Sequence, residues 1–319
     1  MWKFYKTGLI YHAECIQYAV LARRNDATLI TNDSKLSLLC NKLKIEVKYN
    51  KGIIMDYIAN NKAAWEEAFD NKDRSWGEDI VDRISNEEFP FFEKEMADVL
   101  KMYNVKGKII GQFCCNNGRE LLSLMKNGAR QGYGFDIAEN QVQFAREINR
   151  KLGLNCSFIA TNILEIDKKY INKFDLIIIT IGALCWFKDL NAFFSVVAEC
   201  LKDGGVLIIN EQHPVANMLS APGEDNYNEK EPQNLVNSYF EKEWIKNDGI
   251  QYITKKSYKS KTFTSFTHSI SEIVRALCSK HMYIYNMQEF NYDISAMFEH
   301  LNNKGIPLSY ILEAKKGIK

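Results

Sequence analysis

The chain has 319 residues, of which 46% are hydrophobic and 25% are charged, as is usual for a globular protein. Its 41 basic and 40 acidic side chains leave a net charge of +1, which argues against a protein that binds polyanions over its whole surface. The longest apolar run, 176–187, is far shorter than the roughly 20 residues of a membrane-spanning helix. We therefore expect no membrane segment. We also expect no signal peptide, because His12, Glu14 and Arg23-Arg24 interrupt any apolar core near the N-terminus.

The eight cysteines include no CxxC pair, and most of them lie in apolar runs. This usage is typical of reduced thiols rather than of a disulfide framework or a zinc site. We therefore expect a cytoplasmic protein without a bound metal. The oligomeric state stays open between a monomer and a homodimer.

The first 60 residues form a basic segment with 9 basic and 5 acidic side chains. Their hydrophobic spacing predicts a small α/β module. The expected elements are helices over 11–24 and 35–43 and strands over 27–31 and 45–49. The polar stretch 60–73 is typical of a seam between modules, so we expect one domain over 1–60 and a second over 61–319.

From residue 107 onward, strands and helices alternate. The run 174–180 (FDLIIIT) is almost wholly apolar, as expected for a strand buried on both faces. Such alternation predicts a doubly wound, Rossmann-like α/β sheet whose strands are mostly parallel. The expected strands are 108–113, 132–136, 156–160, 174–180 and 206–210, and the expected helices are 117–126, 139–152 and 190–201.

The alternation stops after residue 211. Residues 212–262 are polar and aromatic, and only 251–257 suggests a strand. We interpret 212–262 as an insertion that caps the substrate side of the sheet, where ligands bind outside the strand ends. The pattern then resumes with a helix over 269–280 and strands over 282–291 and 308–314.

The first strand leads through a tight turn, QFCCNNG (112–118), into a helix, and Asp136 ends the next strand. A helix N-terminus suits a charged or polar ligand group, and an acid at this position suits a ribose diol. The arrangement predicts an adenosine-type cofactor. NAD is the weaker alternative, because the GxGxxG spacing that it normally needs is absent.

Five segments at this spacing resemble the class I S-adenosylmethionine-dependent methyltransferases. They are IIGQFCCNNGRELLSL (109–124), GYGFDIAENQVQFARE (132–147), ATNILEI (160–166), FDLIIITIGALCWFKDL (174–190) and LKDGGVLIINEQHP (201–214). The resemblance covers about 75–319. It implies a seven-stranded sheet with an antiparallel last strand. It also implies in-line methyl transfer from S-adenosylmethionine to a small-molecule acceptor, with S-adenosylhomocysteine as product.

The resemblance also assigns the cofactor site by position. It implies that Asp136 holds the ribose and that backbone over 180–182 meets the cofactor's ammonium. The full set is Phe113, Cys114, Asn116, Gly118, Asp136, Ile137, Asn162, Ile163, Thr180, Ile181 and Gly182. The family usually has an acid and three spaced glycines in the turn, whereas here Gln112, Cys114 and Asn116 replace all but Gly118. Because asparagine tolerates left-handed backbone, we expect Asn116 and Asn117 to be the least damaging replacements, and cofactor binding to survive.

The family has no universal catalytic residue, so candidates must come from this chain. His213 follows the fifth strand and has a pKa range suited to a general base, although it is equally a residue that hydrogen-bonds the insertion. His268 and Tyr239 are further candidates. Aromatic residues either wall a planar acceptor or form the insertion's own core: Trp186, Tyr239, Phe240, Trp244, Phe263 and Phe266.

Residues 11–47 resemble the C-terminal half of PIN-type nucleases, with Glu14 and Asp33 at the positions of metal-binding acids. Two carboxylates make a poor metal site, so the resemblance implies a remnant or accessory module without cleavage activity. Two alternatives to a small-molecule methyltransferase follow. One is a catalytically silent scaffold, suggested by the glycine-poor turn. The other is an RNA-directed enzyme that uses residues 1–60, although only this segment is basic and nucleic acid is the minority hypothesis.

Overall fold

The computed structural model describes residues 29–31, 40, 47–49 and 57–318, and the chain divides into two units, Met1–Tyr57 and Ile58–Lys319. In the first unit, β1 (Leu29–Thr31) pairs in parallel with β2 (Val47–Tyr49), and the sequence predicts both strands. Outside the described residues lie the helices predicted over 11–24 and 35–43 and the acids Glu14 and Asp33.

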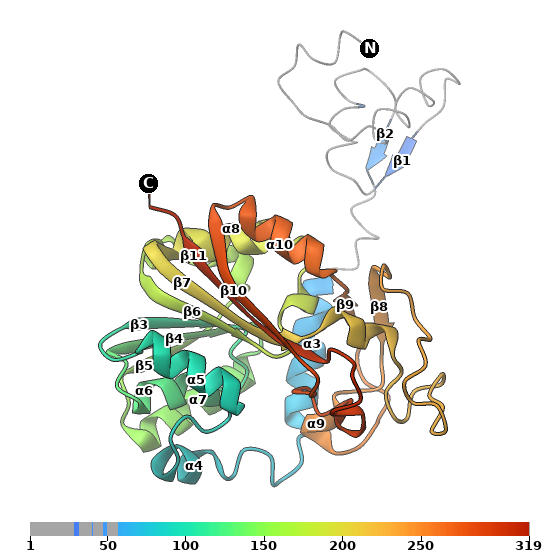
Figure 1. The fold of residues 1–319 in the computed structure, drawn as a ribbon, viewed down its shortest axis with the longest axis horizontal. Helices are drawn as coiled ribbons and strands as arrows, with labels where there is room; N and C mark the ends of the chain where they lie inside the picture. The colour runs from blue at the N-terminus through green and yellow to red at the C-terminus, as the bar shows by residue number, and fades with distance from the viewer. Residues whose placement is uncertain (1–28, 32–39, 41–46, 50–56, 319) are drawn as a thin grey trace. The chain divides into compact units, whose positions relative to one another are not determined.

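A seven-stranded sheet forms the centre of the second unit, in the order β10-β11-β7-β6-β3-β4-β5 (Figure 1). Neighbouring strands are parallel except at β11, which is antiparallel to both β10 and β7. The predicted Rossmann-like sheet with an antiparallel last strand is therefore confirmed. The strands are β3 (Ile109–Phe113), β4 (Gln131–Asp136), β5 (Cys156–Ala160), β6 (Phe174–Thr180), β7 (Leu201–Gln212), β10 (Met282–Phe290) and β11 (Ser309–Lys316).

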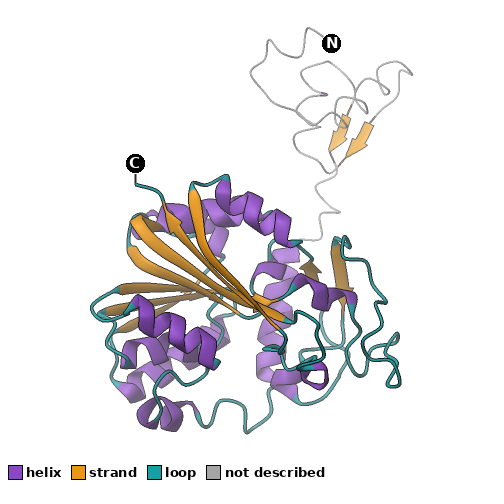
Figure 2. Ribbon diagram, in the orientation of Figure 1, coloured by secondary structure: helices purple, strands orange, loops and turns teal. Residues whose placement is uncertain are grey.

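Helices cover both faces of this sheet (Figure 2), so that its central strands are buried on both sides, as their apolar sequences require. One hydrophobic core includes residues of α8 and α10, and the core on the other face includes residues of α4, α5, α6 and α7. The helices are α4 (Ile80–Asn86), α5 (Lys94–Tyr103), α6 (Arg119–Lys126), α7 (Glu139–Leu152), α8 (Leu190–Cys200) and α10 (Ile270–Cys278). Among the described residues, no helix is both long and apolar enough to cross a membrane.

Residues 60–73, the polar stretch between the two expected domains, lie mostly in helix α3 (Tyr57–Asp70), which was not expected from the sequence. The helix buries only a narrow strip that includes Ala64, Ala68 and Phe69. A strip this narrow in a polar sequence gives little periodic signal. Residues 251–257, expected to be a strand, begin with the single helical turn α9 (Gln251–Thr254), which ends where Lys255 adopts left-handed backbone.

Helix α3 connects the insertion to the sheet domain. Its Asn61 side chain donates to the Thr264 carbonyl and accepts from the Thr264 N–H, both at 2.8 Å. Thr264 belongs to β9 (Phe263–Phe266), which pairs antiparallel with β8 (Glu243–Lys246). At the other side of α3, the Asn140 amide of α7 donates to the Glu66 carbonyl at 2.8 Å. The helix therefore joins β9, which directly follows the expected insertion and pairs with its strand β8, to the N-terminus of α7.

Candidate functional site

The carboxyl ends of β3 and β6 meet where the strand order changes direction, with β4 and β5 on one side and β7 on the other. Ligands of such sheets bind in the crevice outside the strand ends at this point. A hydrogen bond of 3.0 Å from Gln112 Nε2 to Thr180 Oγ1 joins the two strand ends. The predicted cofactor residues of the turn over 113–118 and of the loop over 180–182 therefore lie on either side of this junction.

The turn after β3 keeps left-handed backbone although two of the family's glycines are replaced. Cys114 has φ 58°, Asn116 has φ 49° and Gly118 has φ 76°. A non-glycine residue in this region costs on the order of 1 to 2 kcal/mol, so the surrounding contacts must hold the turn in place. Asn117, which we expected to share this role, is not left-handed. Its buried side chain instead accepts from the Arg119 N–H at 3.4 Å.

Gly118 brings the turn against β5. A Cβ atom at this position would lie 2.4 Å from Phe158 Cε1 and 3.1 Å from Ala145 Cβ, and one at Gly134 would lie 2.5 Å from Phe158 Cδ1. The Phe158 ring therefore fills the space that both glycines leave open. These glycines are needed for packing, and Gly118 is needed for its backbone conformation as well.

The acid that the family carries at the end of the first strand has a substitute in this chain. Gln112 is 1% exposed, its Oε1 accepts from the Leu121 N–H at 3.1 Å, and its Nε2 lies 3.5 Å from Glu120 Oε2. Glu120 is itself buried and pairs with Arg119 at 2.9 Å. Where the resembled family has a carboxylate at the strand end, this chain has one in the first turn of α6, that of Glu120. The Gln112 amide links the ends of β3 and β6 instead.

Asp136 connects the turn to the end of β4. Its Oδ2 accepts from the Asn116 N–H at 2.8 Å and its Oδ1 accepts from the Ala138 N–H at 3.0 Å. Burial raises the pKa of Asp136, and the backbone donors partly offset this effect. Because a carboxylate has about four acceptor sites, it keeps capacity for the two hydroxyl donors of a ribose. The residues present therefore fit the adenosine part of the predicted cofactor.

The remaining predicted cofactor residues divide into two kinds. The Thr161 N–H donates to the Asp136 carbonyl at 2.7 Å, which brings the segment before Asn162 to the end of β4. Asn162 also caps the short helix η2 (Ile163–Glu165), accepting from the Leu164 N–H at 3.1 Å. Ile137 is partly exposed, whereas the side chains of Ile163 and Phe113 are buried in the core.

Glu211, near the end of β7, is a residue whose role the sequence does not reveal. It is 4% exposed. Its Oε2 accepts from the Gly182 N–H at 2.6 Å, and its Oε1 accepts from Ala183 at 2.6 Å and Leu184 at 2.9 Å. These donors begin the loop that leads into η4 (Leu184–Trp186). In the sequence, Glu211 can be noticed only as a polar residue beside a predicted loop. Its role is not visible there, because its donors are backbone groups, which no residue type indicates.

The three predicted catalytic residues are all engaged in hydrogen bonds. His213 Nδ1 accepts from the Val215 N–H at 3.1 Å, and its Nε2 lies 2.8 Å from Glu289 Oε1. His268 Nε2 lies 2.9 Å from the Phe187 carbonyl oxygen. Tyr239 Oη accepts from the Ile270 N–H at 3.2 Å. Burial lowers the pKa of both histidines, which favours the neutral form of each.

Tyr310 adds a buried hydroxyl to this side of the sheet. It lies opposite Glu211 on β7 and Glu289 on β10, so the three side chains share one face. The residue is fully buried, yet its Oη has no hydrogen-bond partner in the described structure. Burial raises the pKa of Tyr310 well above its usual value, and Glu211 adds to this shift, so the hydroxyl stays protonated.

We expect Tyr310→Phe to cause no loss in the free energy of unfolding, because it removes no hydrogen bond. Tyr103→Phe is the matched control, since Tyr103 Oη donates to the Asp175 carbonyl at 2.8 Å and its loss should cost about 1 kcal/mol. Urea unfolding followed by circular dichroism measures both. A loss for Tyr310→Phe larger than that of the control would show that the hydroxyl has a structural partner.

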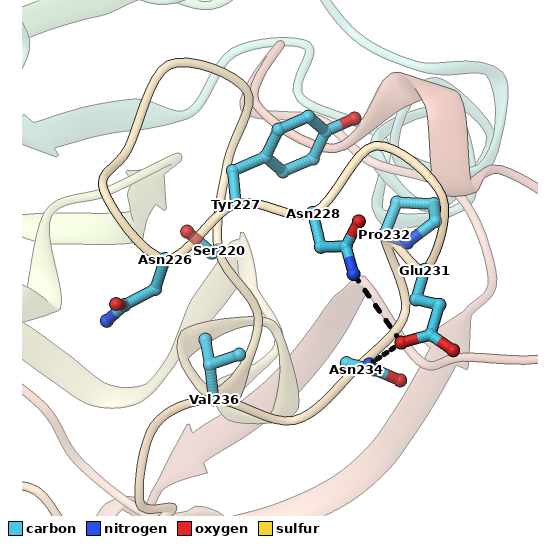
Figure 3. A pocket seen from close by; sticks show the side chains of 8 residues that line it. All are labelled: Ser220, Asn226, Tyr227, Asn228, Glu231, Pro232, Asn234 and Val236. Carbon is cyan, nitrogen blue, oxygen red and sulfur yellow. Dashed lines mark hydrogen bonds between the residues drawn. The ribbon is translucent and has the colours of Figure 1, made fainter.

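Aromatic side chains from α3, η4 and β9 pack together beside the loop that Glu211 holds. Trp65 is perpendicular to both Trp186 and Phe263, with ring centroids 5.4 and 5.6 Å apart. A separate hollow of about 220 Å³ lies within the insertion (Figure 3). That volume is below the roughly 300 Å³ at which ligand pockets begin, so we do not assign the acceptor to it. It is lined by Ser220, Asn226, Tyr227, Asn228, Glu231, Pro232, Asn234 and Val236.

A comparison with known protein families identifies one domain in this chain. Residues 104–249, a little under half of the chain, match a family model described as a methyltransferase domain. No curated protein matches the chain.

Solved structures share the fold at low sequence identity. One is an S-adenosylmethionine-dependent methyltransferase from Mesorhizobium loti, with a TM-score of 0.53 and 17% identity over 73% of this chain and 100% of that one. Another, from Methanosarcina mazei, has a TM-score of 0.51 and 17% identity over 69% of this chain and 98% of that one. The geranyl diphosphate C-methyltransferase of Streptomyces coelicolor A3(2) has a TM-score of 0.52 and 14% identity over 82% of this chain and 99% of that one. The chain thus has the fold of class I methyltransferases.

Proposed function

We propose that this protein binds S-adenosylmethionine and transfers its methyl group to a small-molecule acceptor, with S-adenosylhomocysteine as product. The observation that supports this most directly is Asp136, which holds the left-handed turn at Asn116 while keeping acceptor capacity for a ribose. The family match over 104–249 supports the same reading. The bound cofactor supplies a methyl group already activated on a sulfonium, so the residues of this chain act mainly by binding and positioning.

Each part of the crevice has a separate role in this proposal. Asp136 accepts from the ribose hydroxyls, and Asn162 and Ile137 border the adenine. Backbone of the turn over 113–118 and of the loop over 180–182 surrounds the amino acid portion. The acceptor lies on the side of the insertion, where the Trp65 cluster contributes apolar surface. The cap excludes water and holds the acceptor close to the methyl group in the orientation that in-line displacement needs.

Among the catalytic candidates, we place His268 ahead of His213. The Phe187 carbonyl can only accept, so His268 Nε2 carries the proton and Nδ1 has the free lone pair that a general base needs. The corresponding lone pair of His213 is already occupied by the Val215 N–H. Such a base matters when the acceptor atom is a hydroxyl oxygen or an ammonium nitrogen.

Calorimetric titration with S-adenosylmethionine and S-adenosylhomocysteine tests the proposal. We expect micromolar binding to the wild type, and Asp136→Ala should weaken it at least tenfold, about 1.4 kcal/mol. Asp167→Ala is the matched control, because its carboxylate also accepts a backbone N–H, from Lys169 at 2.9 Å, but caps a turn outside the crevice. The control should bind both ligands as the wild type does.

Two results would contradict the proposal. Failure of the folded wild type to bind either ligand would favour the silent scaffold, for which the strained residues Cys114 and Asn116 are the supporting observation. Binding that Asp136→Ala leaves unchanged would place the cofactor elsewhere. In the first case, RNA binding that is lost at high salt and on deletion of residues 1–60 would favour the RNA-directed alternative.

A further inference from the structure

The loop after β6 is held by a single carboxylate from the neighbouring strand. Glu211 is buried and accepts from three consecutive N–H groups, those of Gly182, Ala183 and Leu184, at 2.6 to 2.9 Å. Bonds from backbone N–H groups to a carboxylate are charge-assisted and stronger than neutral ones. Burial raises the pKa of Glu211, and these backbone donors partly offset this effect. Gly182 has φ 78°, and a Cβ there would meet nothing within 4 Å. The loop therefore borders open space, and its conformation depends on Glu211.

This arrangement fixes the direction of the carbonyl groups as well. In a trans peptide the N–H and the C=O point in opposite directions, so three N–H groups aimed at Glu211 turn three carbonyls away from it. The Gly182 and Ala183 carbonyls accept within the turn, from Cys185 Sγ and the Trp186 N–H, both at 3.2 Å. The third carbonyl, that of Ile181, belongs to the peptide that leaves the end of β6.

We propose that Glu211 is a positioning residue, which orients the peptide between Ile181 and Gly182 so that the Ile181 carbonyl accepts from the ammonium group of the bound cofactor. This inference rests on the proposed function. It assigns to Glu211 a part in recognising the amino acid portion of the cofactor and none in recognising the adenosine portion, which Asp136 contacts. The two parts can therefore be separated with two ligands.

The test compares S-adenosylhomocysteine with 5′-methylthioadenosine. The sulfur of each is an uncharged thioether, but 5′-methylthioadenosine lacks the amino and carboxylate groups of S-adenosylhomocysteine. Glu211→Gln keeps one oxygen, which serves the donors of Ala183 and Leu184, and places an NH₂ group against the Gly182 N–H. We expect calorimetry to show S-adenosylhomocysteine binding weakened at least tenfold and 5′-methylthioadenosine binding changed less than twofold. A substitution that merely loosened the fold would weaken both ligands together.

Two control variants give the experiment its contrast. Asp136→Ala should weaken both ligands. Asp175→Asn should weaken neither, because Asp175 accepts from the Ile109 N–H at 2.8 Å at the opposite end of the strands. If Glu211→Gln does not fold in a thermal melt, Glu211→Asp carries the same expectation, because its shorter side chain cannot reach all three donors.

The outcomes separate this inference from the proposed function. Selective loss of S-adenosylhomocysteine binding supports the role of Glu211. Equal loss of both ligands, or loss of neither, overturns that role while the cofactor assignment stands. A wild type that binds neither ligand overturns the proposed function and this inference with it.

Discussion

Gln112→Glu is expected to lower the free energy of unfolding by about 3 kcal/mol. The side chain is buried, donates to Thr180 Oγ1 at 3.0 Å and lies 3.5 Å from Glu120 Oε2. A carboxylate at this position loses both donors and faces a second buried carboxylate, so one of the two charges has no compensation. Urea unfolding at pH 7, followed by circular dichroism, measures the loss.

The double variant Gln112→Glu/Glu120→Gln is the decisive control. It returns the acid to the strand end and places the amide on α6, so one donor again faces one carboxylate, and stability should recover to within about 1 kcal/mol. Gln143→Glu, at an exposed position on α7 beside Arg146, should change nothing measurable. A double variant as unstable as Gln112→Glu would show that the contact with Glu120 is not the cause.

Gly118→Ala is expected to cost about 3 to 4 kcal/mol, as the sum of backbone strain and overpacking. The residue has φ 76°, and its new methyl group would lie 2.4 Å from Phe158 Cε1. Because the turn would have to move away from β5, affinity for S-adenosylhomocysteine should fall as well. Urea unfolding and calorimetry on the same preparation measure the two effects.

Gly153→Ala separates the two sources of this cost. Gly153 ends α7 with φ 64°, and a Cβ there meets nothing within 4 Å, so only the strain of about 1 to 2 kcal/mol applies. In the Gly118→Ala background, Phe158→Leu should recover part of the stability, since it shortens the side chain that the new methyl group meets. Equal losses for Gly118→Ala and Gly153→Ala would show that Phe158 yields without cost.

The sequence was sufficient to predict the sheet because its strands carry their own signal. β6 is apolar except for Asp175 and Thr180, and Asp136 ends β4 where the spacing places it. The left-handed turn was predicted in part: Asn116 adopts it, but Cys114 does so in place of Asn117. No propensity of cysteine indicates this conformation, which the neighbouring hydrogen bond from Asn116 to Asp136 helps to impose.

Features that depend on distant partners could not be predicted. Asn61 is unremarkable in a polar helix until Thr264, 203 residues away, supplies the matching backbone groups. Glu211 was visible as a polar residue after a strand, but its three donors are backbone groups of another loop. Likewise, the sequence does not show that Tyr310 lies opposite Glu211, because this depends on the register between β7 and β11.

Helix α3 has a consequence for the order in which the protein forms during synthesis. Its contact with Asn140 spans 74 residues of chain, but its contact with Thr264 spans 203. At translation rates of about 5 to 20 residues per second, the second partner leaves the ribosome about 10 to 40 s after the helix. During this interval the Trp65 ring lacks its contact with Phe263. The strands from β3 to β7 are synthesised before β9, whereas β10 and β11 follow it, so β9 emerges when five of the seven strands of the sheet have been made.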